Sequence, residues 1–463
     1  MFSPTMTTPE AIETSQSRGH LDADGQALRA APVKKGRNWL SAIPPASKMA
    51  MICYSFADQA FAVGGGFLAN VALARSQSKE DYGLFALWYS VFTFLSGLHN
   101  AAILQPYTVY ASGRYRDNFS EYLRLTVRNN AVLSAALTGL LLSCCLVFHW
   151  VRPQWLSPAL LGLAIAVGFL LSGLFLRRAF YVQQRPDLAA KSSFVFFVVL
   201  VTGLWLGGRA HKLDSFTVFV LMAAGWIVAG VLFGRKLQFG KPAQHFGKIV
   251  PGYWGEHWNY AKWILATAFV FQLTTQGYYW LLGGLLSAKE VGEFRAMYIL
   301  VGPVDQVFIA ISYLIVPALA AHYATHRMRS FLSLWRRFTL AAIIVTGLFA
   351  LVVRITGRSV VHILYGGKYD DLTPYFFALG FLPLILWIGT TMGQAFYGAE
   401  KPKFVFWAYV GSGAVTICLG IPLVTYFGLW GAVYGMLLSS AAYTIVLAAT
   451  FFWTFHPLRS QPE

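Results

Sequence analysis

Two aspartates stand inside long apolar stretches of this sequence, where an ionised carboxylate is costly. Asp58 and Asp305 are each followed by a glutamine, Gln59 and Gln306. Ionisable side chains in such stretches are functional candidates, because surroundings of low polarity disfavour the charged form. A carboxyl held there can bind a proton or a sodium ion and release it again. For Asp58, which heads a face of small residues, a hydrogen-bonded structural role fits equally well.

Asp305 belongs to a polar stripe. Tyr298, Gly302 and Ser312 lie at i−7, i−3 and i+7 from it, which places all four residues on one face of a helix. This grouping favours a functional role for Asp305 over a buried structural pair. The sequence therefore predicts a polar site near the middle of the membrane.

Two basic residues, Lys262 and Arg295, fall within apolar segments, each near one end. Long basic side chains at such positions commonly extend to lipid headgroups. If they faced an internal passage instead, they would attract a phosphate group. The sequence leaves both roles open.

Several neutral or weakly basic polar side chains also lie inside apolar segments. They are Asn70, His99, Gln105, Gln272 and Gln276. Amides on one helical face suit the hydroxyls of a passing solute, and they suit hydrogen bonds between helices equally well. His99 is in addition the kind of group that titrates near neutral pH, although a packing histidine is the alternative.

The elements that carry these residues follow from composition. The chain has 463 residues, of which 57% are hydrophobic and 12% charged, whereas soluble domains have about 25% charged residues. Its apolar runs are continuous and about 20 residues long, enough to cross a hydrocarbon core. Continuous runs exclude an alternating β-barrel pattern. The net charge of +17 is scattered between the runs, so it does not indicate nucleic-acid binding. The predicted class is an all-α polytopic membrane protein.

About twelve membrane spans are predicted from these runs. They lie near residues 50–74, 83–112, 129–149, 157–178, 192–208, 215–234, 259–286, 291–320, 333–353, 372–398, 403–425 and 429–455. The corresponding domains are a disordered cytoplasmic tail (1–49), a six-helix lobe (50–234), a cytoplasmic linker (235–258), a second six-helix lobe (259–456) and a cytoplasmic C-terminus (457–463).

Charge distribution orients the spans. Most of the 36 Lys and Arg residues fall on the N-terminal tail and on the even-numbered connections, and only Lys262 and Arg295 are expected within spans. Positive loops stay in the cytoplasm, so both termini of this multi-pass protein are predicted to be cytoplasmic.

An internal repeat links the two lobes. Residues 79–85 (KEDYGLF) and 288–294 (AKEVGEF) align at a spacing of 209, each between an opening helix and a long second helix. Pro106 and Pro317 follow in the second helices. An even number of spans per repeat puts both lobes in the same orientation, which is the parallel-repeat design with a passage between the lobes.

The connections argue against an enzyme. None is long enough for a catalytic domain, and no phosphate-binding glycine loop, nucleophile elbow or zinc-protease helix occurs. A membrane glycosyltransferase or ligase remains the third hypothesis. This hypothesis would gain support if four residues converged on one external pocket, namely Arg354, Arg358, His362 and Asp370.

Residues 55–110 resemble a known family. Ser55–Ala60, the glycine-rich Val63–Asn70, Leu73–Arg75 and Tyr82–Ala86 are similar to the opening helical hairpin of Wzx-like polysaccharide flippases, in the multidrug/oligosaccharidyl-lipid/polysaccharide (MOP) exporter superfamily. The resemblance implies two six-helix lobes that alternate between inward-open and outward-open V shapes. Many relatives have fourteen spans, so the twelve expected here leave the subfamily open.

The resemblance also implies a cargo: a polyprenyl-diphosphate-linked oligosaccharide, moved across the inner membrane for exopolysaccharide, capsule or O-antigen synthesis. Membrane lipids, a polysaccharide polymerase and a chain-length regulator are the partners to expect, with no nucleic acid. No enzymatic cofactor is expected, only a coupling proton or sodium ion. The alternative is a cation-coupled multidrug exporter. A wide cationic cavity would favour the flippase, and a narrower apolar and aromatic one the drug exporter.

Overall fold

The computed structural model describes residues 45–112, 115, 118–151, 157–237, 250–325 and 327–455. By its internal contacts the chain divides into two units, Met1–Ile52 and Cys53–Glu463. The described part of the first unit is helical, and all contacts below belong to the second. Most of the expected tail (1–49) and the expected C-terminus (457–463) lie outside the described residues.

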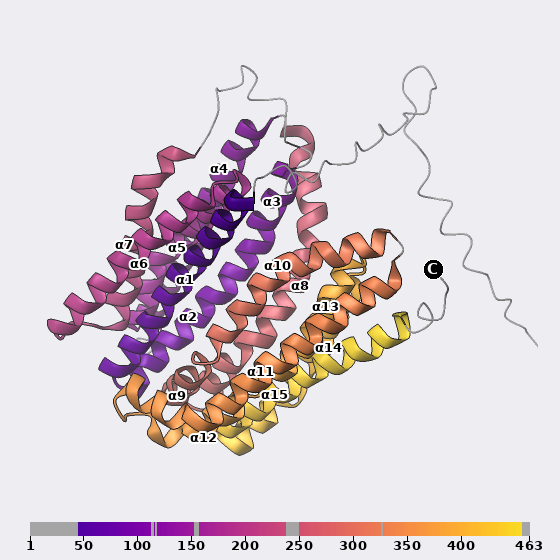
Figure 1. Cartoon of the computed structure of the whole chain (residues 1–463). Coiled ribbons are helices and arrows are strands. Elements are labelled where there is room, and N and C mark those ends of the chain that lie inside the picture. Colours follow the sequence, from indigo (N-terminus) through magenta and orange to yellow (C-terminus); the bar gives the residue numbers. More distant parts are fainter. Residues whose placement is uncertain are drawn as a thin grey trace, which may run out of the picture. The chain divides into compact units, whose positions relative to one another are not determined.

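Helices make up the described N-terminal half (Figure 1). In chain order they are α1 (Pro45–Ser76), α2 (Lys79–His99), the π-helix η4 (Asn100–Leu104), α3 (Gln105–Ser112), α4 (Phe119–Val151), α5 (Pro158–Val182), α6 (Pro186–Arg209), α7 (Ser215–Phe233) and the short η6 (Gly234–Lys236). Because α2, η4 and α3 follow one another without a gap, they form a single expected span with one widened turn in it.

The C-terminal half is built in the same way. Its elements are α8 (Val250–Leu285), α9 (Ala288–Tyr298), α10 (Gly302–Ala324), α11 (Met328–Tyr365), η7 (Asp370–Leu372), α12 (Thr373–Leu379), α13 (Leu382–Gly398), α14 (Lys403–Cys418) and α15 (Gly420–Phe455). The all-α polytopic class predicted from the sequence is confirmed. The two halves together form one compact unit.

Turn chemistry sets the helix ends. Short polar side chains accept a hydrogen bond from a free backbone N–H at the start of three helices, α2, α5 and α7; they are Ser78, Ser157 and Asp214. At Gly428 the backbone takes φ 56° and ψ −129°, which folds α15 back on itself. A Cβ on Gly431 would lie 1.9 Å from the carbonyl oxygen of Leu423, so this turn also needs glycine at that position. The two arms of α15 match the end of the eleventh and the whole of the twelfth expected span.

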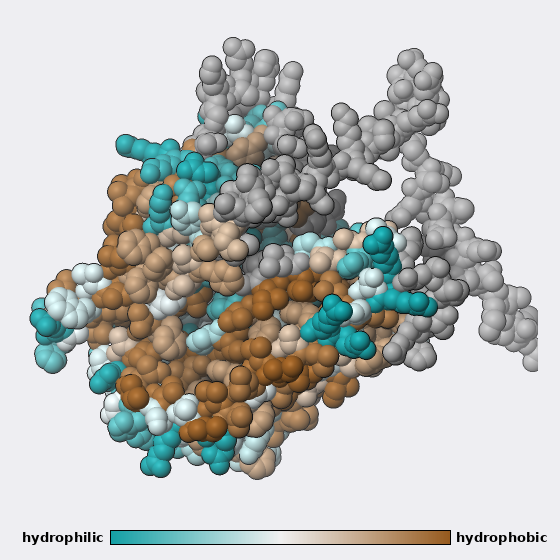
Figure 2. All heavy atoms as spheres, viewed as in Figure 1, coloured by the Kyte–Doolittle hydropathy of each residue, from teal (hydrophilic) through white to brown (hydrophobic). Residues whose placement is uncertain are grey.

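Eight helices among the described residues are long and apolar enough to cross a membrane. The remaining expected spans coincide with α8, with the interrupted helices α2–η4–α3 and α9–α10, and with α14, which is apolar but only 16 residues long. Interruptions within a span are tolerated where the chain is covered by protein. Figure 2 shows the lipid-compatible exterior, where hydrophobic residues cover most of the visible face and hydrophilic residues gather near the helix ends.

Three expectations about helix ends were wrong. Helix α8 begins at Val250, so the linker expected at 235–258 is partly helical. Arg177 and Arg178 lie in the last turns of α5 and not in a loop. Helix α11 continues to Tyr365, which places Arg354 and Arg358 on a helix. In each case the helix extends past the apolar run. A helix ends where its backbone N–H and C=O groups no longer find partners within the helix, and this point need not coincide with the last apolar residue.

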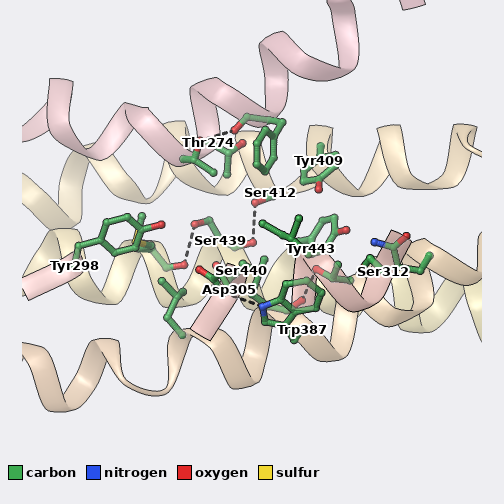
Figure 3. Close-up of a pocket in the computed structure, with 18 of the residues that line it drawn as sticks. Thr274, Tyr298, Asp305, Ser312, Trp387, Tyr409, Ser412, Ser439, Ser440 and Tyr443 are labelled. Atoms are coloured by element: carbon green, nitrogen blue, oxygen red, sulfur yellow. Dashed lines mark hydrogen bonds between the residues drawn. The ribbon is translucent and has the colours of Figure 1, made fainter. Parts of the chain in front are cut away.

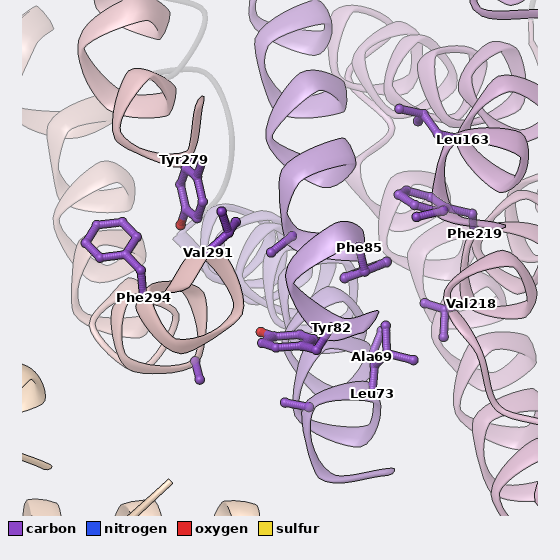
Figure 4. Packing of buried hydrophobic residues seen from close by; sticks show 14 of the residues in the cluster. Ala69, Leu73, Tyr82, Phe85, Leu163, Val218, Phe219, Tyr279, Val291 and Phe294 are labelled. Atoms are coloured by element: carbon purple, nitrogen blue, oxygen red, sulfur yellow. The ribbon is translucent and has the colours of Figure 1, made fainter. Parts of the chain in front are cut away.

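Buried aromatic and aliphatic residues of α2 join the two halves. Figure 4 shows Phe85 facing Val218 and Phe219 of α7 on one side, and Tyr82 facing α9 on the other. Phe85 and Phe219 have ring centroids 5.0 Å apart. Since Tyr82, Phe85 and Phe219 are almost fully buried, α2 is a central helix of the core.

Candidate functional site

The two repeat segments meet in the structure. A Cβ on Gly83 of α2 would lie 1.6 Å from the carbonyl oxygen of Ala288, and a Cβ on Gly292 of α9 would lie 2.3 Å from that of Lys79. Gly83 corresponds to Gly292 in the repeat, and Lys79 corresponds to Ala288. Equivalent residues therefore contact each other across the two halves, and glycine is required on both sides. We call this the α2–α9 contact.

Arg295 lies beside the α2–α9 contact with no carboxylate partner among the described residues. Its Nε donates to Oδ1 of Asn70 at 3.1 Å, and its Nη1 donates to the Tyr279 hydroxyl at 3.1 Å. The guanidinium also lies over the rings of Tyr89 and Tyr279, 4.9 and 5.7 Å from their centroids. Cation–π contacts and neutral acceptors replace an ion pair here. The structure thus brings together two predicted candidates, Asn70 and Arg295, from opposite halves.

Ion pairs surround the α2–α9 contact. Lys79 Nζ lies 2.9 Å from Oε1 of Glu293 and 3.5 Å from Oδ2 of Asp371. Lys368 donates to the carbonyl oxygens of Ala74 and Gln77, at the end of α1. Burial and the neighbouring Lys79 lower the pKa of Lys368 from its ordinary value. Every one of these contacts connects the N-terminal half to the C-terminal half.

Helix α8 extends this connection. Gln272 donates from Nε2 to the Thr93 carbonyl oxygen at 2.6 Å, and Trp280 donates to the Ser90 hydroxyl at 3.0 Å. Gln272 is buried and leaves no room for a Cβ on Gly97 of α2. Gln272 therefore forms a hydrogen bond between helices α8 and α2, which is one of the two roles considered from the sequence.

Gln272, Thr275, Gln276 and Tyr279 form a polar face of α8, and this face is divided between two surroundings. Gln272 faces α2, Tyr279 holds Arg295, and Thr275 lines a cavity within the C-terminal half. The fourth member, Gln276, is buried, and its Oε1 has no hydrogen-bond partner in the structure.

That cavity is the main candidate site. It has a volume of about 600 Å³ and is lined by residues of α8, α9, α10, α13, α14 and α15. Figure 3 shows Asp305 beside Trp387, whose Nε1 donates to Oδ1 of the carboxyl at 2.8 Å. Within the described chain no Lys or Arg side chain forms an ion pair with Asp305. The carboxyl consequently faces the cavity with its charge uncompensated.

The cavity wall combines aromatic rings with hydroxyl groups. Three members of the stripe predicted around Asp305 line it, namely Tyr298, Asp305 and Ser312. Tyr409 and Tyr443 stack with centroids 4.6 Å apart. Hydroxyls from α8, α13, α14 and α15 complete the wall, among them Thr274, Thr390, Ser412, Ser439 and Ser440. The cavity therefore offers apolar ring faces, many hydrogen-bonding groups and a single charge, which is negative.

Asp58 has different surroundings. It is fully buried, and Arg177 of α5 holds both of its oxygens, with Nε–Oδ1 at 2.9 Å and Nη2–Oδ2 at 2.7 Å. The hydroxyls of Tyr181 and Ser193 donate to the same carboxylate at 2.8 and 2.5 Å. Gln59 accepts from Arg177 at 3.4 Å. Four donors on α5 and α6 hold this carboxylate, two of them from its ion-pair partner Arg177, and this geometry favours the structural role for Asp58.

The small-residue face that follows Asp58 is packed in the same way. Gly65 lies against α6, where an added Cβ would come within 3.1 Å of the Phe196 ring and 3.3 Å of a Leu200 methyl. Helix α1 runs without interruption through Gly64–Gly66. These glycines serve close helix packing.

The remaining candidates are scattered. His99 is buried, and its Nε2 lies 2.7 Å from Oδ1 of Asn130 on α4. Gln105 and Lys262 are exposed, and Gln306 is half-buried beside Asp305. None of these four residues lines the cavity.

The third hypothesis required four residues to converge. His362 contacts Asp370 at 2.7 Å, but Arg354 lies over the ring of Phe377, and Arg354, Arg358 and His362 are exposed. Only His362 and Asp370 of these four residues contact each other among the described interactions. The four side chains therefore do not form the external pocket that would favour a glycosyltransferase or ligase.

Several residues of the site were missed from the sequence. Trp387, Tyr409 and Tyr443 carry no charge, and aromatic residues in apolar runs resemble ordinary core residues. Arg177 was counted as a loop residue because it follows the apolar run of α5. Its position 119 residues after Asp58 gave no signal of their contact.

Comparisons with solved structures identify the fold. No family model and no curated protein matches the chain. Among solved structures, the inward-facing conformation of a multidrug resistance MATE family transporter of the MOP superfamily superposes with a TM-score of 0.70 at 11% identity, covering 88% of this chain and 96% of that one. The outward-facing conformation of a transporter of the same description gives 0.63 at 10% identity, covering 89% and 96%.

A MOP superfamily transporter from Pyrococcus furiosus, described as having a binding pocket of reverse polarity, gives a TM-score of 0.62 at 9% identity over 89% of this chain and 96% of that one. The chain has the MATE transporter fold. It is a multi-pass membrane protein with the fold expected for the MOP superfamily.

Proposed function

We propose that the chain moves a polyprenyl-diphosphate-linked oligosaccharide across the bacterial inner membrane, for exopolysaccharide, capsule or O-antigen synthesis. The observation that carries the proposal is the wall of the Asp305 cavity. A pyranose ring has an apolar C–H face and a rim of hydroxyls, so it needs aromatic surfaces and hydrogen-bonding groups together. Tyr409 and Tyr443 supply the first, and Ser412, Ser439 and their neighbours supply the second.

The size of the cavity supports a sugar as its occupant. About 600 Å³ falls within the range of about 300–1,000 Å³ typical of small-molecule sites. Asp305 can accept hydrogen bonds from two sugar hydroxyls through its two oxygens. The resemblance of residues 55–110 to polysaccharide flippases supports the same cargo class.

The diphosphate needs a cation that the cavity itself does not provide, because its lining has no basic residue. Arg295 stands three residues before Tyr298, one helical turn from the cavity wall on α9. In this proposal, separation of the α2–α9 contact frees Arg295 from Asn70 and Tyr89. The guanidinium then holds the diphosphate while the sugars occupy the cavity.

Orientation completes the proposal. Both termini lie in the cytoplasm, and the α2–α9 contact lies at the extracytoplasmic end, which is closed in this structure. The dense contacts of Arg295, Lys79 and Gly83 support closure there. The higher TM-score for the inward-facing relative supports the same assignment.

A second candidate is a cation-coupled multidrug exporter. The specific observation in its favour is the uncompensated carboxyl of Asp305 among aromatic rings, which also suits an organic cation. An aromatic cavity whose described lining has no basic residue meets the criterion given above for the exporter, whereas the flippase proposal relies on Arg295, which lies outside the cavity. Solved neighbours are described as multidrug transporters.

One experiment separates the two candidates. Purified protein in proteoliposomes is given a fluorescent polyprenyl-diphosphate trisaccharide in one arm and an organic-cation dye in the other. The flippase predicts that the wild type moves the lipid-linked sugar and that Asp305→Ala does not, while Asp187→Asn, a surface acid paired with Arg185, behaves as wild type. Transport of the dye alone would establish the exporter instead. In cells, Asp305→Ala would abolish surface polysaccharide at normal expression.

A further inference from the structure

A second hollow lies between the start of α11 and the end of α15. It has a volume of about 290 Å³ and is lined by Arg329, Ser333, Trp335 and Arg336 of α11, with Phe451 and Phe455 of α15 as its apolar side. None of these residues lines the Asp305 cavity. The hollow is thus separate from the proposed cargo site.

Its polar side is basic and lacks a counter-ion. Arg329, Ser333 and Arg336 stand at i, i+4 and i+7 on α11, so they share one helical face. Neither arginine forms an ion pair with a carboxylate in the part of the chain that the structure describes. Figure 2 shows hydrophilic residues gathered where α10 leads into α11.

A buried donor points to a missing acceptor. Trp335 Nε1 is inaccessible to water and has no hydrogen-bond partner, although a buried indole N–H nearly always finds one. The same indole stacks against Phe451, with ring centroids 4.3 Å apart. The ring is therefore held in place while its N–H remains unsatisfied.

The apolar side continues into the lipid-facing surface. Phe452 is 55% exposed and Trp453 is 76% exposed, and Lys401 lies over the ring of Phe455 at 5.8 Å. An occupant must hence be anionic at one end and apolar at the other. A phosphate attached to acyl chains has this form, and basic pockets between membrane helices are typical of anionic lipid headgroups.

We propose that this hollow binds the phosphate headgroup of an anionic phospholipid. Arg329 and Arg336 neutralise the phosphate, and the Ser333 hydroxyl donates to its oxygens. The headgroup displaces the side chains that cover Trp335 Nε1, which then donates to the phosphate as well, and an acyl chain lies along Phe451, Phe452 and Phe455. The bound lipid fixes the start of α11 to the end of α15.

The test uses the full chain in lipid nanodiscs of phosphatidylcholine, with or without phosphatidylglycerol. Native mass spectrometry then counts the phosphatidylglycerol retained after extraction into detergent. We expect wild type to retain one tightly bound molecule, and Arg329→Gln/Arg336→Gln to bind it about thirtyfold more weakly, since each of the two interfacial basic residues is worth about 1 kcal/mol and tenfold in affinity corresponds to about 1.4 kcal/mol. The matched control is Arg337→Gln/Arg358→Gln, which removes two exposed arginines of α11 that do not line the hollow.

Trp335→Phe keeps the ring and removes the donor, so it provides a second variant that should fold as wild type. Its retention of phosphatidylglycerol should fall while its elution on size exclusion stays unchanged. Equal retention by wild type, the double variant and Trp335→Phe would overturn the proposal. Inorganic phosphate is added in a parallel arm to the protein in phosphatidylcholine. If it raised the thermal unfolding temperature as much as phosphatidylglycerol does, a free anion would be the ligand and the lipid would be excluded.

Discussion

Arg295 Nε lies 3.1 Å from Oδ1 of Asn70, although the two residues are 225 positions apart in the chain. Asn70 belongs to α1 of the N-terminal half, and Arg295 belongs to α9 of the C-terminal half. All partners of this guanidinium are neutral: an amide oxygen, a phenol and two ring faces. A cation held by neutral groups can be released more easily than one held in a buried ion pair. That is the property required of a contact that must open and close.

The first prediction converts this neutral contact into an ionic one. Asn70→Asp places a carboxylate 3.1 Å from Arg295 and should stabilise the closed arrangement by about 1–3 kcal/mol, since hydrogen bonds to charged groups contribute about 1.5–3 kcal/mol. The loss of the Asn70 donor to Gly66 O offsets part of that gain. We expect a higher thermal unfolding temperature and slower transport, measured in detergent and in proteoliposomes respectively.

Asn70→Leu is the control for this change. It removes the acceptor, leaves Arg295 with fewer partners and should lower the unfolding temperature. Asn70→Asp protein that is more stable and still transports at the wild-type rate would contradict the role given to this contact.

The second prediction concerns the paired glycines. In Gly83→Ala the added Cβ, in its ideal position, would lie 1.6 Å from the carbonyl oxygen of Ala288. Overpacking of this kind costs about 1–3 kcal/mol or more. Because the clash exists only while α2 and α9 are in contact, the substitution should favour their separation. Distances between spin labels on α2 and α9 should lengthen. Gly139→Ala, where a Cβ meets nothing within 4 Å, should leave them unchanged.

A third prediction tests the buried pair of Asp58 and Arg177. Removing one member of a buried ion pair costs about 3–5 kcal/mol, because the other charge is left without a partner. Asp58→Ala should therefore lower the yield of folded protein and its unfolding temperature. Asp58→Leu/Arg177→Met should recover much of the loss. If Asp58→Ala protein were as stable as wild type but inactive in transport, Asp58 would belong to the transport machinery.

The fourth prediction isolates the hydrogen bond between Trp387 and Asp305. Trp387→Phe keeps an aromatic wall and removes the Nε1 donor, which lies 2.8 Å from the carboxyl. Loss of a hydrogen bond to a carboxyl that faces the cavity should weaken cargo binding about tenfold, with little change in unfolding temperature. Fluorescence titration with a polyprenyl-diphosphate trisaccharide measures this effect. Unchanged affinity would mean that Trp387 does not orient Asp305 for the cargo.

The sequence predicted the helices well because span length and apolar content follow directly from bilayer thickness. The sequence predicted two repeated halves but did not predict which residues join them. The repeat at Gly83 and Gly292 was visible, but their direct contact depends on tertiary packing. Asp305 was identified because placing a carboxylate inside a membrane costs free energy. Tyr409 and Tyr443, which stack on each other in the wall of the same cavity, carry no charge and gave no such signal.

Arg177 illustrates the limit of charge counting. Basic residues just beyond an apolar run are assigned to loops, but α5 continues through Val182 and turns Arg177 inward to Asp58. Two aspartates that had similar surroundings in the sequence, Asp58 and Asp305, therefore have opposite ones in the structure. One is neutralised by an arginine, and the other is open to a cavity.

The contact of Gly83 with the backbone of 288 and of Gly292 with the backbone of 79 is isologous, with the same surface patch on both partners. Such a patch is the form taken when two identical six-helix chains associate face to face. A duplicated and fused half-length ancestor would inherit it without inventing a new interface. Every later change at one glycine then has to suit its counterpart, which keeps the two halves matched at this contact.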